Sequence, residues 1–208
     1  TGLYPIPLPS GIGLESSGII EEIGSEVKLF KVGDRVAHAS MPIGAYSEKQ
    51  IMPEEKLISV PDGISDQVAS CITLKGITAE YLLHRAYPLK KGDKVLYHAA
   101  AGALGQILCP WANSLGAEVI GTVGSKAKEE IAKKNGCHHV INYSEKNFSE
   151  EVEKIVGKNG IDVVSDGVGI KTFKGSIEKL KISYQVWSHE ASTFKNIARI
   201  ANAVQCHN

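Results

Sequence analysis

LYHAAAGALGQ, residues 96–106, is the most informative stretch of this chain. Residues typical of a β-strand run into a cluster of alanine and glycine, and an apolar helix-like pattern follows. Ala100, Gly102 and Gly105 have the spacing of the dinucleotide fingerprint GxGxxG, with alanine in the first position. Alanine can replace that glycine if its φ angle stays negative. Small residues also occur at strand–helix turns for packing alone, so the surrounding sequence has to distinguish the two interpretations.

Predicted strands and helices alternate on both sides of this stretch. We expect strands at 94–100, 118–123, 138–143 and 161–169, and helices at 101–117, 125–136 and 148–160. Gly116 and Gly136 should end the first two helices, and Pro110 should kink the first helix or shorten it. Strands separated by helices of this length predict a parallel, doubly wound sheet, which favours the dinucleotide interpretation.

The N-terminal part of the chain has a different pattern. Short runs of β-forming residues between glycine and proline predict strands at 17–24, 34–40, 45–52 and 56–61. Helical spacing follows at 65–87, with Ser65 or Asp66 as the N-cap. The predicted fold class is therefore α/β, with a β-rich domain at 1–75 and a dinucleotide-binding domain at 76–208.

Composition limits the partners of the chain. The 208 residues contain 23 Lys plus Arg and 23 Asp plus Glu, so the formal net charge is zero, which argues against nucleic acid or a membrane surface. The four cysteines form no CxxC pair, which argues against a disulfide scaffold and predicts the cytoplasm. No apolar run has the length of a membrane span. Because the chain opens at Thr1, we expect its natural N-terminus to lie upstream.

The residues after the second predicted strand of the 76–208 domain indicate the cofactor. A NAD site places Asp or Glu about twenty residues after the glycines, where it bonds the ribose 2′-hydroxyl. Here the strand ends in Gly124 and Ser125 without an acid, and Lys126 and Lys128 follow. A 2′-phosphate would meet small residues and positive charge, which predicts NADPH. In the alternative interpretation, the lysines belong to a solvated helix face.

Several segments together resemble the zeta-crystallin-type quinone oxidoreductases of the medium-chain dehydrogenase/reductase superfamily. They are residues 1–24, 32–48, 74–83, 98–125, 140–143 and 165–169, so the resemblance extends from Thr1 to about Lys181. In that family an AxGxxG turn is usual. The resemblance implies a partial GroES-like catalytic domain, a Rossmann domain, and NADPH-dependent reduction of quinones by hydride transfer.

The resemblance also implies site residues. Tyr4 would line the quinone pocket as the catalytic hydrogen-bond donor, and Thr78 would approach the nicotinamide. The cofactor would be bound by the turn residues Ala101, Gly102, Ala103 and Leu104 at the pyrophosphate, by Gly124, Ser125, Lys128 and Tyr143 around the 2′-phosphate and adenine ribose, and by Val168 on the adenosine side. In the alternative, Tyr4 is a surface aromatic residue, Thr78 an ordinary helix residue and Tyr143 a cap on the sheet.

A metal-free site is expected. Zinc-dependent relatives carry a Gly-His-Glu triplet whose histidine binds the metal, whereas this chain has Gly13, Leu14 and Glu15, and leucine cannot be a ligand. No histidine has partners at ligand spacing, so we expect the histidines to be core or surface residues. We expect Cys71 to be a buried structural cysteine.

Both ends of the chain depart from the family pattern. The family's N-terminal segment, which supplies further residues of the quinone pocket, is absent, and residues 183–208 do not continue the Rossmann pattern, although 192–204 could form an amphipathic helix. We therefore expect an incomplete parallel sheet with an exposed edge after its fourth strand, and hence a homo-oligomer.

The sequence is also compatible with two alternative functions. An NADPH-dependent reductase of enones or alkenals would use a similar fold. A non-catalytic remnant would bind NADPH or RNA, but zero net charge and the lack of aromatic and basic clusters argue against RNA.

Overall fold

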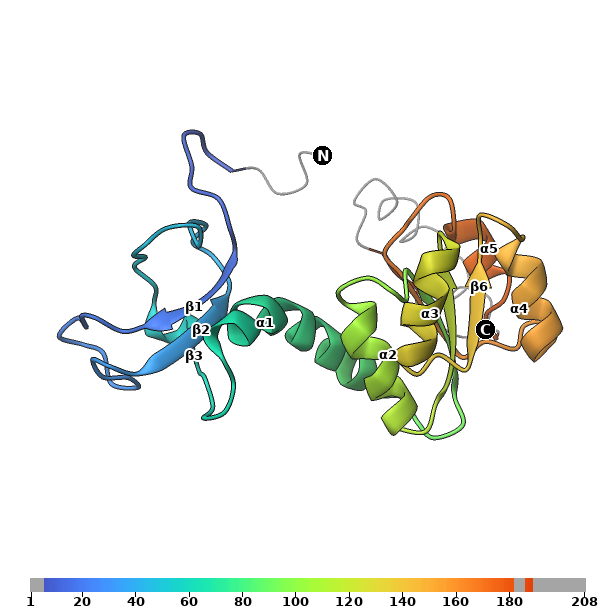
Figure 1. Ribbon diagram of the computed structural model, residues 1–208, viewed down its shortest axis with the longest axis horizontal. Coiled ribbons are helices and arrows are strands. Elements are labelled where there is room, and N and C mark those ends of the chain that lie inside the picture. The colour runs from blue at the N-terminus through green and yellow to red at the C-terminus, as the bar shows by residue number, and fades with distance from the viewer. Residues whose placement is uncertain (1–5, 182–185, 189–208) are drawn as a thin grey trace, which may run out of the picture. The chain divides into compact units, whose positions relative to one another are not determined.

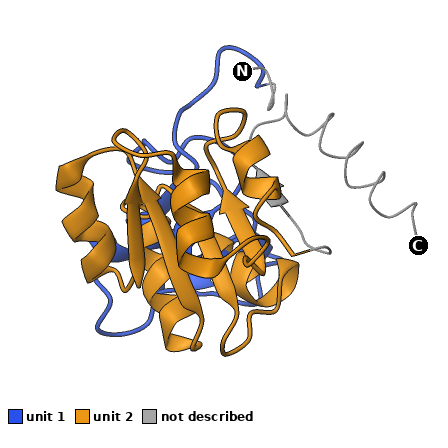
Figure 2. Ribbon diagram, turned by 90° about the vertical axis from the view of Figure 1, so that its right-hand side faces the viewer, with its two compact units in different colours: residues 1–77 blue, residues 78–208 orange. Residues whose placement is uncertain are grey.

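The structure is a computed structural model that describes residues 6–181 and 186–188. The chain divides into two compact units, residues 1–77 and 78–208, coloured blue and orange in Figure 2. Tyr4 and the predicted amphipathic helix at 192–204 lie outside the described residues.

Unit 1 contains a three-stranded antiparallel sheet of order β1-β2-β3 (Figure 1). The strands are β1 (Glu15–Ile19), β2 (Arg35–Ala39) and β3 (Ile58–Ser59), and the short 3₁₀ helix η1 (Glu54–Lys56) precedes β3. Three of the four predicted strands of this region are therefore confirmed as elements, each shorter than predicted, and β1 begins two residues before its predicted start.

The prediction of a strand at 45–52 is wrong. The backbone N–H groups of Ala45 and Tyr46 donate to the carbonyl groups of Gly13 and Ile12, but the ladder does not continue. The Ser47 hydroxyl donates to the carbonyl oxygens of Gly44 and Lys49 instead, which closes a local turn. Serine forms such turns readily, and this one competes with the strand that the alternating pattern predicts.

Helix α1 (Asp66–Glu80) follows the β-rich region, and the π-helical segment η2 (Tyr81–Ala86) continues it. The Ser65 hydroxyl accepts a hydrogen bond from the Val68 N–H at 3.3 Å, which identifies Ser65 rather than Asp66 as the N-cap. The helical prediction at 65–87 is confirmed, with a change to π-helical hydrogen bonding in its last turns.

Unit 2 contains a parallel sheet of order β6-β5-β4-β7-β8. Its strands are β4 (Lys94–His98), β5 (Glu118–Val123), β6 (His139–Asn142), β7 (Val163–Asp166) and β8 (Val186–Ser188), and its helices are α2 (Gly105–Ser114), α3 (Lys126–Lys134), α4 (Phe148–Val156) and α5 (Phe173–Ile177). The predicted α/β class with a doubly wound parallel sheet is confirmed.

Alternation along the strands places two apolar cores on opposite faces of this sheet. Tyr97 and Val119 belong to the core covered by α2 and α3, whereas Leu96 and Ile120 belong to the core covered by α4 (Figures 1 and 2). Both faces are buried, so the strands are almost continuously apolar, as in other parallel sheets.

Two expectations for unit 2 need correction. The first helix begins at Gly105 rather than residue 101, because residues 101–104 form the turn, and it ends at Ser114 with Pro110 inside it. The sheet does not end at its fourth strand, since β8 pairs in parallel with β7. β8 contains valine and tryptophan, which favour strands, and it occupies the edge that the sequence was expected to leave open.

Candidate functional site: a nucleotide-binding edge and a separate pocket

The predicted cofactor residues of the turn, of β5, of β6 and of β7 lie at one edge of the parallel sheet. β4 ends at His98, β5 at Val123, β6 at Asn142 and β7 at Asp166, and the predicted residues follow these ends. Carboxyl ends of parallel strands share one edge, and the strand order reverses between β4 and β7. Ligands of open α/β sheets bind at such a topological switch point.

The turn after β4 carries its strained conformation at Ala99 and not at Ala100. Ala99 has a φ of 62°, a left-handed value that is uncommon for a residue with a Cβ. Its carbonyl accepts the Gly102 N–H at 2.8 Å, which tightens the turn. Ala100 is absent from the positive-φ residues, so the condition for alanine in the first fingerprint position is met.

Close contacts surround the two fingerprint glycines, Gly102 and Gly105. A Cβ at Gly102 would lie 3.0 Å from the Ala99 oxygen, and a Cβ at Gly105 would overlap the Ala100 backbone. Gly121 on β5 leaves space for the Ala100 side chain, because a Cβ at Gly121 would lie 2.6 Å from the Ala100 Cβ. This packing brings the start of α2 against the strands, as the third fingerprint glycine does in dinucleotide-binding folds.

The exposed side of the turn has hydrogen-bond donors without protein partners. Within the described part of the chain, the backbone N–H groups of Ala103 and Leu104, which precede α2, donate to no protein acceptor. Gly102 and Ala103 are exposed, and Ala101 and Leu104 are half-buried. N–H groups at a helix start attract anions such as phosphate, so these residues fit a pyrophosphate.

Gly124 and Tyr143 lie against each other at the ends of β5 and β6. A Cβ at Gly124 would lie 2.6 Å from the Tyr143 hydroxyl oxygen, so only glycine at position 124 leaves space for the phenol in its present position. The Tyr143 N–H donates to the Val123 carbonyl at 3.0 Å, and the residue is 45% exposed. The ring therefore presents an open face beside the end of β5.

Ser125 and Lys128 are placed next to this pair. Ser125 is the N-cap of α3 in an extended conformation, but its hydroxyl caps no N–H of that helix. The Lys128 side chain is exposed and has no hydrogen-bond or ion-pair partner among the residues described, whereas Lys133 of the same helix pairs with Glu130 at 2.9 Å. A half-buried hydroxyl that caps no N–H group and an unpaired ammonium group at a helix start suit a phosphate ester.

The loop after β7 is held by one carboxylate. Asp166 accepts hydrogen bonds from the N–H groups of Val168 and Gly169 at 2.9 and 3.0 Å and from the Thr172 hydroxyl. Val168 is thus fixed in place through its backbone, and its side chain is half-buried.

His98 lies below the turn in the core and is no part of its surface. Its ring contacts the hydroxyl oxygens of Thr122 and Ser176 at 2.9 and 2.8 Å and packs edge-on against Phe148. Burial lowers the pKa of His98 below its ordinary value, although the nearby Asp166 opposes this shift. The ring is therefore neutral at neutral pH.

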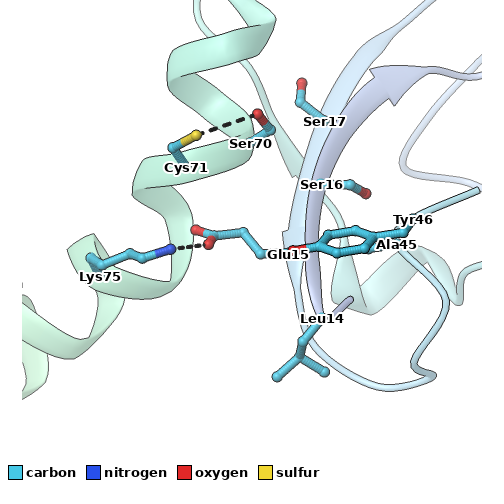
Figure 3. A pocket seen from close by; sticks show the side chains of 9 residues that line it. All are labelled: Leu14, Glu15, Ser16, Ser17, Ala45, Tyr46, Ser70, Cys71 and Lys75. Carbon is cyan, nitrogen blue, oxygen red and sulfur yellow. Dashed lines mark hydrogen bonds and ion pairs between the residues drawn. The ribbon is translucent and has the colours of Figure 1, made fainter. Parts of the chain in front are cut away.

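Unit 1 contains a separate cavity of about 500 Å³ (Figure 3). Its lining comes from β1, from the 45–46 segment and from α1: Leu14, Glu15, Ser16, Ser17, Ala45, Tyr46, Ser70, Cys71 and Lys75. Cys71 is exposed here, so the expectation of a buried structural cysteine is wrong. Cys71 and Lys75 are four residues apart on α1, which places both side chains on the helix face towards the cavity.

Tyr4 and Thr78 are the residues predicted to lie nearest the quinone and the nicotinamide, and the structure describes only Thr78. Tyr4 lies outside the described residues. Thr78 is half-buried in α1 and is the first residue of unit 2. Over residues 6–181 and 186–188, no three His, Cys, Asp or Glu side chains gather in a way that could hold a metal ion.

Comparison with known families matches both parts of the chain. The alcohol dehydrogenase GroES-like domain model matches residues 1–89, and the zinc-binding dehydrogenase model matches residues 103–185. The quinone oxidoreductase of Pseudomonas aeruginosa is 46% identical over 179 residues, or 86% of this chain and 55% of that protein. A 2-haloacrylate reductase from Burkholderia is 47% identical over 175 residues, or 83% of this chain and 53% of that protein. The chain spans about half the length of these curated relatives.

Solved structures agree with these matches. Escherichia coli quinone oxidoreductase complexed with NADPH has a TM-score of 0.83 and 40% identity, over 94% of this chain and 63% of that one. A mycobacterial protein complexed with NADPH has a TM-score of 0.82 and 33% identity, over 99% of this chain and 75% of that one. The chain belongs to the quinone oxidoreductase family of the medium-chain dehydrogenases and reductases.

Three further residues have structural roles at the two sites that their sequence surroundings do not clearly indicate. Asp166 follows a strand and precedes glycines, a weak signal of a loop-organising carboxylate. In the sequence, Glu15 stands out only as the residue after Leu14 in the triplet Gly13, Leu14 and Glu15. Lys75 precedes Gly76 in a helix without any motif around it, and its contact with Glu15 crosses 60 residues of sequence, so no local pattern indicates it.

Proposed function

We propose that the chain acts as an NADPH-dependent quinone reductase, with unit 2 binding the cofactor and unit 1 contributing to the acceptor site. The observation that carries this proposal is the carboxyl edge of the unit 2 sheet. Its glycine turn offers unpaired N–H groups for a pyrophosphate, and the Gly124, Ser125 and Lys128 group has no acid that would repel a 2′-phosphate.

The residues present fit NADPH. Ala101, Gly102, Ala103 and Leu104 would bind the pyrophosphate, and Lys128 and Ser125 would bind the 2′-phosphate. Tyr143 would cover the adenine ribose beside Gly124, and Val168 would contact the adenosine side. When bound, the reduced nicotinamide supplies a hydride, and the chain's own task is to orient the two reactants and exclude water.

Acceptor reduction needs no acid–base pair in this proposal. A quinone is already electron-poor, so holding its ring and donating a hydrogen bond to the developing oxyanion is sufficient help from the protein. We propose Tyr4 as one such donor and Thr78 as a residue beside the nicotinamide. We propose no metal ion in the reaction, because Leu14 occupies the place of the zinc-binding histidine in the family pattern.

A second candidate is reduction of an activated alkene. The relative named 2-haloacrylate reductase is as similar to this chain as the quinone oxidoreductases are, at 47% identity. An enone or acrylate also forms an oxyanion or enolate when it accepts hydride, so the same donors would serve.

We further propose a cytoplasmic protein that associates with copies of itself. The widely spaced cysteines support a reducing compartment, and the position of β8 at the edge of the unit 2 sheet supports association through that edge. Among the residues that the structure describes, no helix has both the length and the apolar character to cross a membrane.

Acceptor-dependent oxidation of NADPH tests the proposal. The protein is mixed with NADPH and, in parallel, with naphthoquinone, an alkenal or a haloacrylate, and loss of the reduced nicotinamide absorbance is followed. Faster turnover of the quinone supports the proposal, and faster turnover of an alkene supports the second candidate. Saturable NADPH binding without turnover of any acceptor would contradict both.

A further inference from the structure

Most of the polar groups that line the unit 1 cavity are occupied by the chain itself. The Ser17 hydroxyl donates to Val36 and Asp66, and the Ser70 hydroxyl donates to the Gln67 carbonyl. Ser16 is hydrogen-bonded to the His38 ring at 2.7 Å. A ligand oxygen in this cavity therefore finds few free donors on the three serines.

Lys75 is different, because its ammonium group has three donors and Glu15 takes one of them (Figure 3). The Lys75 ammonium group makes no other hydrogen bond among the described residues. Its side chain is 30% exposed, and it is the one cation among the nine lining residues. Two charged donor positions thus remain available on a side chain that lines the cavity.

Glu15 fixes this ammonium group in position. One carboxylate oxygen of Glu15 pairs with Lys75, and the other accepts the backbone N–H of Leu74 at 2.6 Å. The Glu15 side chain is only 10% exposed, so the pair is screened little by solvent. The carboxylate on β1 therefore holds the lysine on α1, and the ammonium group needs little reorganisation to meet a ligand.

The remaining walls suit a flat, partly apolar ligand. Leu14 and Ala45 are apolar, and the Tyr46 ring lies over Gly13, where a Cβ would come within 2.6 Å of the ring. A volume of about 500 Å³ falls within the range of pockets for small organic molecules.

We propose that this cavity binds the acceptor and that Lys75 is a catalytic residue which hydrogen-bonds the acceptor's carbonyl oxygen. This inference rests on the proposed reductase function. The acceptor gains a hydride and its two electrons from the reduced nicotinamide, which is oxidised. The negative charge collects on the carbonyl oxygen beside the ammonium group, and that oxygen then takes a proton from water. Glu15 is a positioning residue that acts through Lys75.

The first test measures charge stabilisation without turnover. The probe is 4-nitrophenol, a phenol whose anion absorbs visible light, and it is titrated with the full chain over a range of pH. An ammonium group within contact lowers the pKa of the bound phenol by about 1 to 3. The inference predicts this lowering in the wild type and in Lys75→Arg, and its loss in Lys75→Met. An equal lowering in Lys75→Met would overturn the inference.

Matched variants separate a charge effect from a folding effect. Lys49→Met removes an exposed lysine of the same unit, which pairs with Glu21, and should leave the probe unchanged. Lys75→Met leaves the Glu15 carboxylate without its cation, so the double variant Glu15→Gln/Lys75→Met is also measured. Glutamine still accepts the Leu74 N–H, and the inference predicts the same loss of the probe's pKa shift in a protein that unfolds at the wild-type temperature.

The second test uses turnover of naphthoquinone. Removing one oxyanion donor costs on the order of 10²-fold in rate, so Lys75→Met should lower kcat/KM by about this factor while the Kd for NADPH stays the same. Unchanged kcat/KM in Lys75→Met would overturn the inference. If the wild type reduces no acceptor, the proposed function fails, and the phenol titration still decides whether Lys75 stabilises an anion.

Discussion

The Nε2 atom of His98 lies 3.9 Å from a carboxylate oxygen of Asp166, and neither side chain reaches solvent. The Ser176 hydroxyl bridges them, at 2.8 Å from the imidazole and 3.4 Å from the carboxylate. This buried group connects β4 to β7 at the point where the strand order reverses, directly beneath the glycine turn. The carboxyl edge of the unit 2 sheet is therefore joined by a buried polar network inside an otherwise apolar core.

Acid should weaken unit 2 through His98. Burial lowers the pKa of His98 from its ordinary value of 6.5, so the unfolded chain binds a proton that the folded chain does not. The stabilising contribution is fully present above pH 6.5 and is lost as the pH falls below it. In the variant His98→Gln, the free energy of unfolding should be lower at neutral pH but should fall less steeply with acid. Urea denaturation at a series of pH values measures this, and an unchanged slope would contradict the account.

Gly105→Ala should destabilise the fold by about 1–3 kcal/mol, because the new Cβ would overlap the Ala100 backbone. Gly76→Ala is the matched control, since Gly76 lies in α1 and nothing is within 4 Å of its Cβ position. The control should raise stability by about 0.5–1 kcal/mol. Thermal unfolding of both variants measures the difference, and equal melting temperatures would argue against close packing of the turn.

Gly124→Ala should weaken NADPH binding by displacing Tyr143. The new Cβ would lie 2.6 Å from the phenol oxygen, so the ring has to move away from the end of β5. We expect the Kd for NADPH to rise about tenfold, which corresponds to about 1.4 kcal/mol. Fluorescence titration with NADPH measures it, with Gly18→Ala in β1 as the control because its Cβ position is open. An unchanged Kd would remove Tyr143 from the proposed site.

The sequence predicted the parallel sheet well because its signals are local. Each strand of unit 2 from β4 to β7 is an apolar run, and Gly116 and Gly136 end helices with φ values of 84° and 82°. The strand predicted at 45–52 failed because the Ser47 hydroxyl closes a turn, which competes with the alternating pattern. The edge strand β8 was missed because three residues are too few for any periodicity to be visible.

The candidate site was only partly predictable for the same reason. The glycine turn and the missing acid after β5 can be identified from spacing. Lys75 and Glu15 become neighbours only when β1 packs beside α1, and Asp166 acquires its role only when the 168–172 loop folds around it. Such contacts depend on tertiary structure, so no window of sequence contains them.

The preference for NADPH over NADH, compared between the wild type and Lys128→Ala, decides whether the carboxyl edge of the unit 2 sheet binds NADPH as proposed. The Kd of each nucleotide is measured by fluorescence titration, and Lys133→Ala, whose lysine pairs with Glu130 on the same helix, is the control. We expect the wild type and Lys133→Ala to prefer NADPH. We expect Lys128→Ala to lose about 1.5–3 kcal/mol of NADPH affinity, which is typical of a hydrogen bond to a charged group, and to bind NADH as the wild type does. A wild type that prefers NADH, or a Lys128→Ala variant with the full preference for NADPH, would contradict the nucleotide site described above.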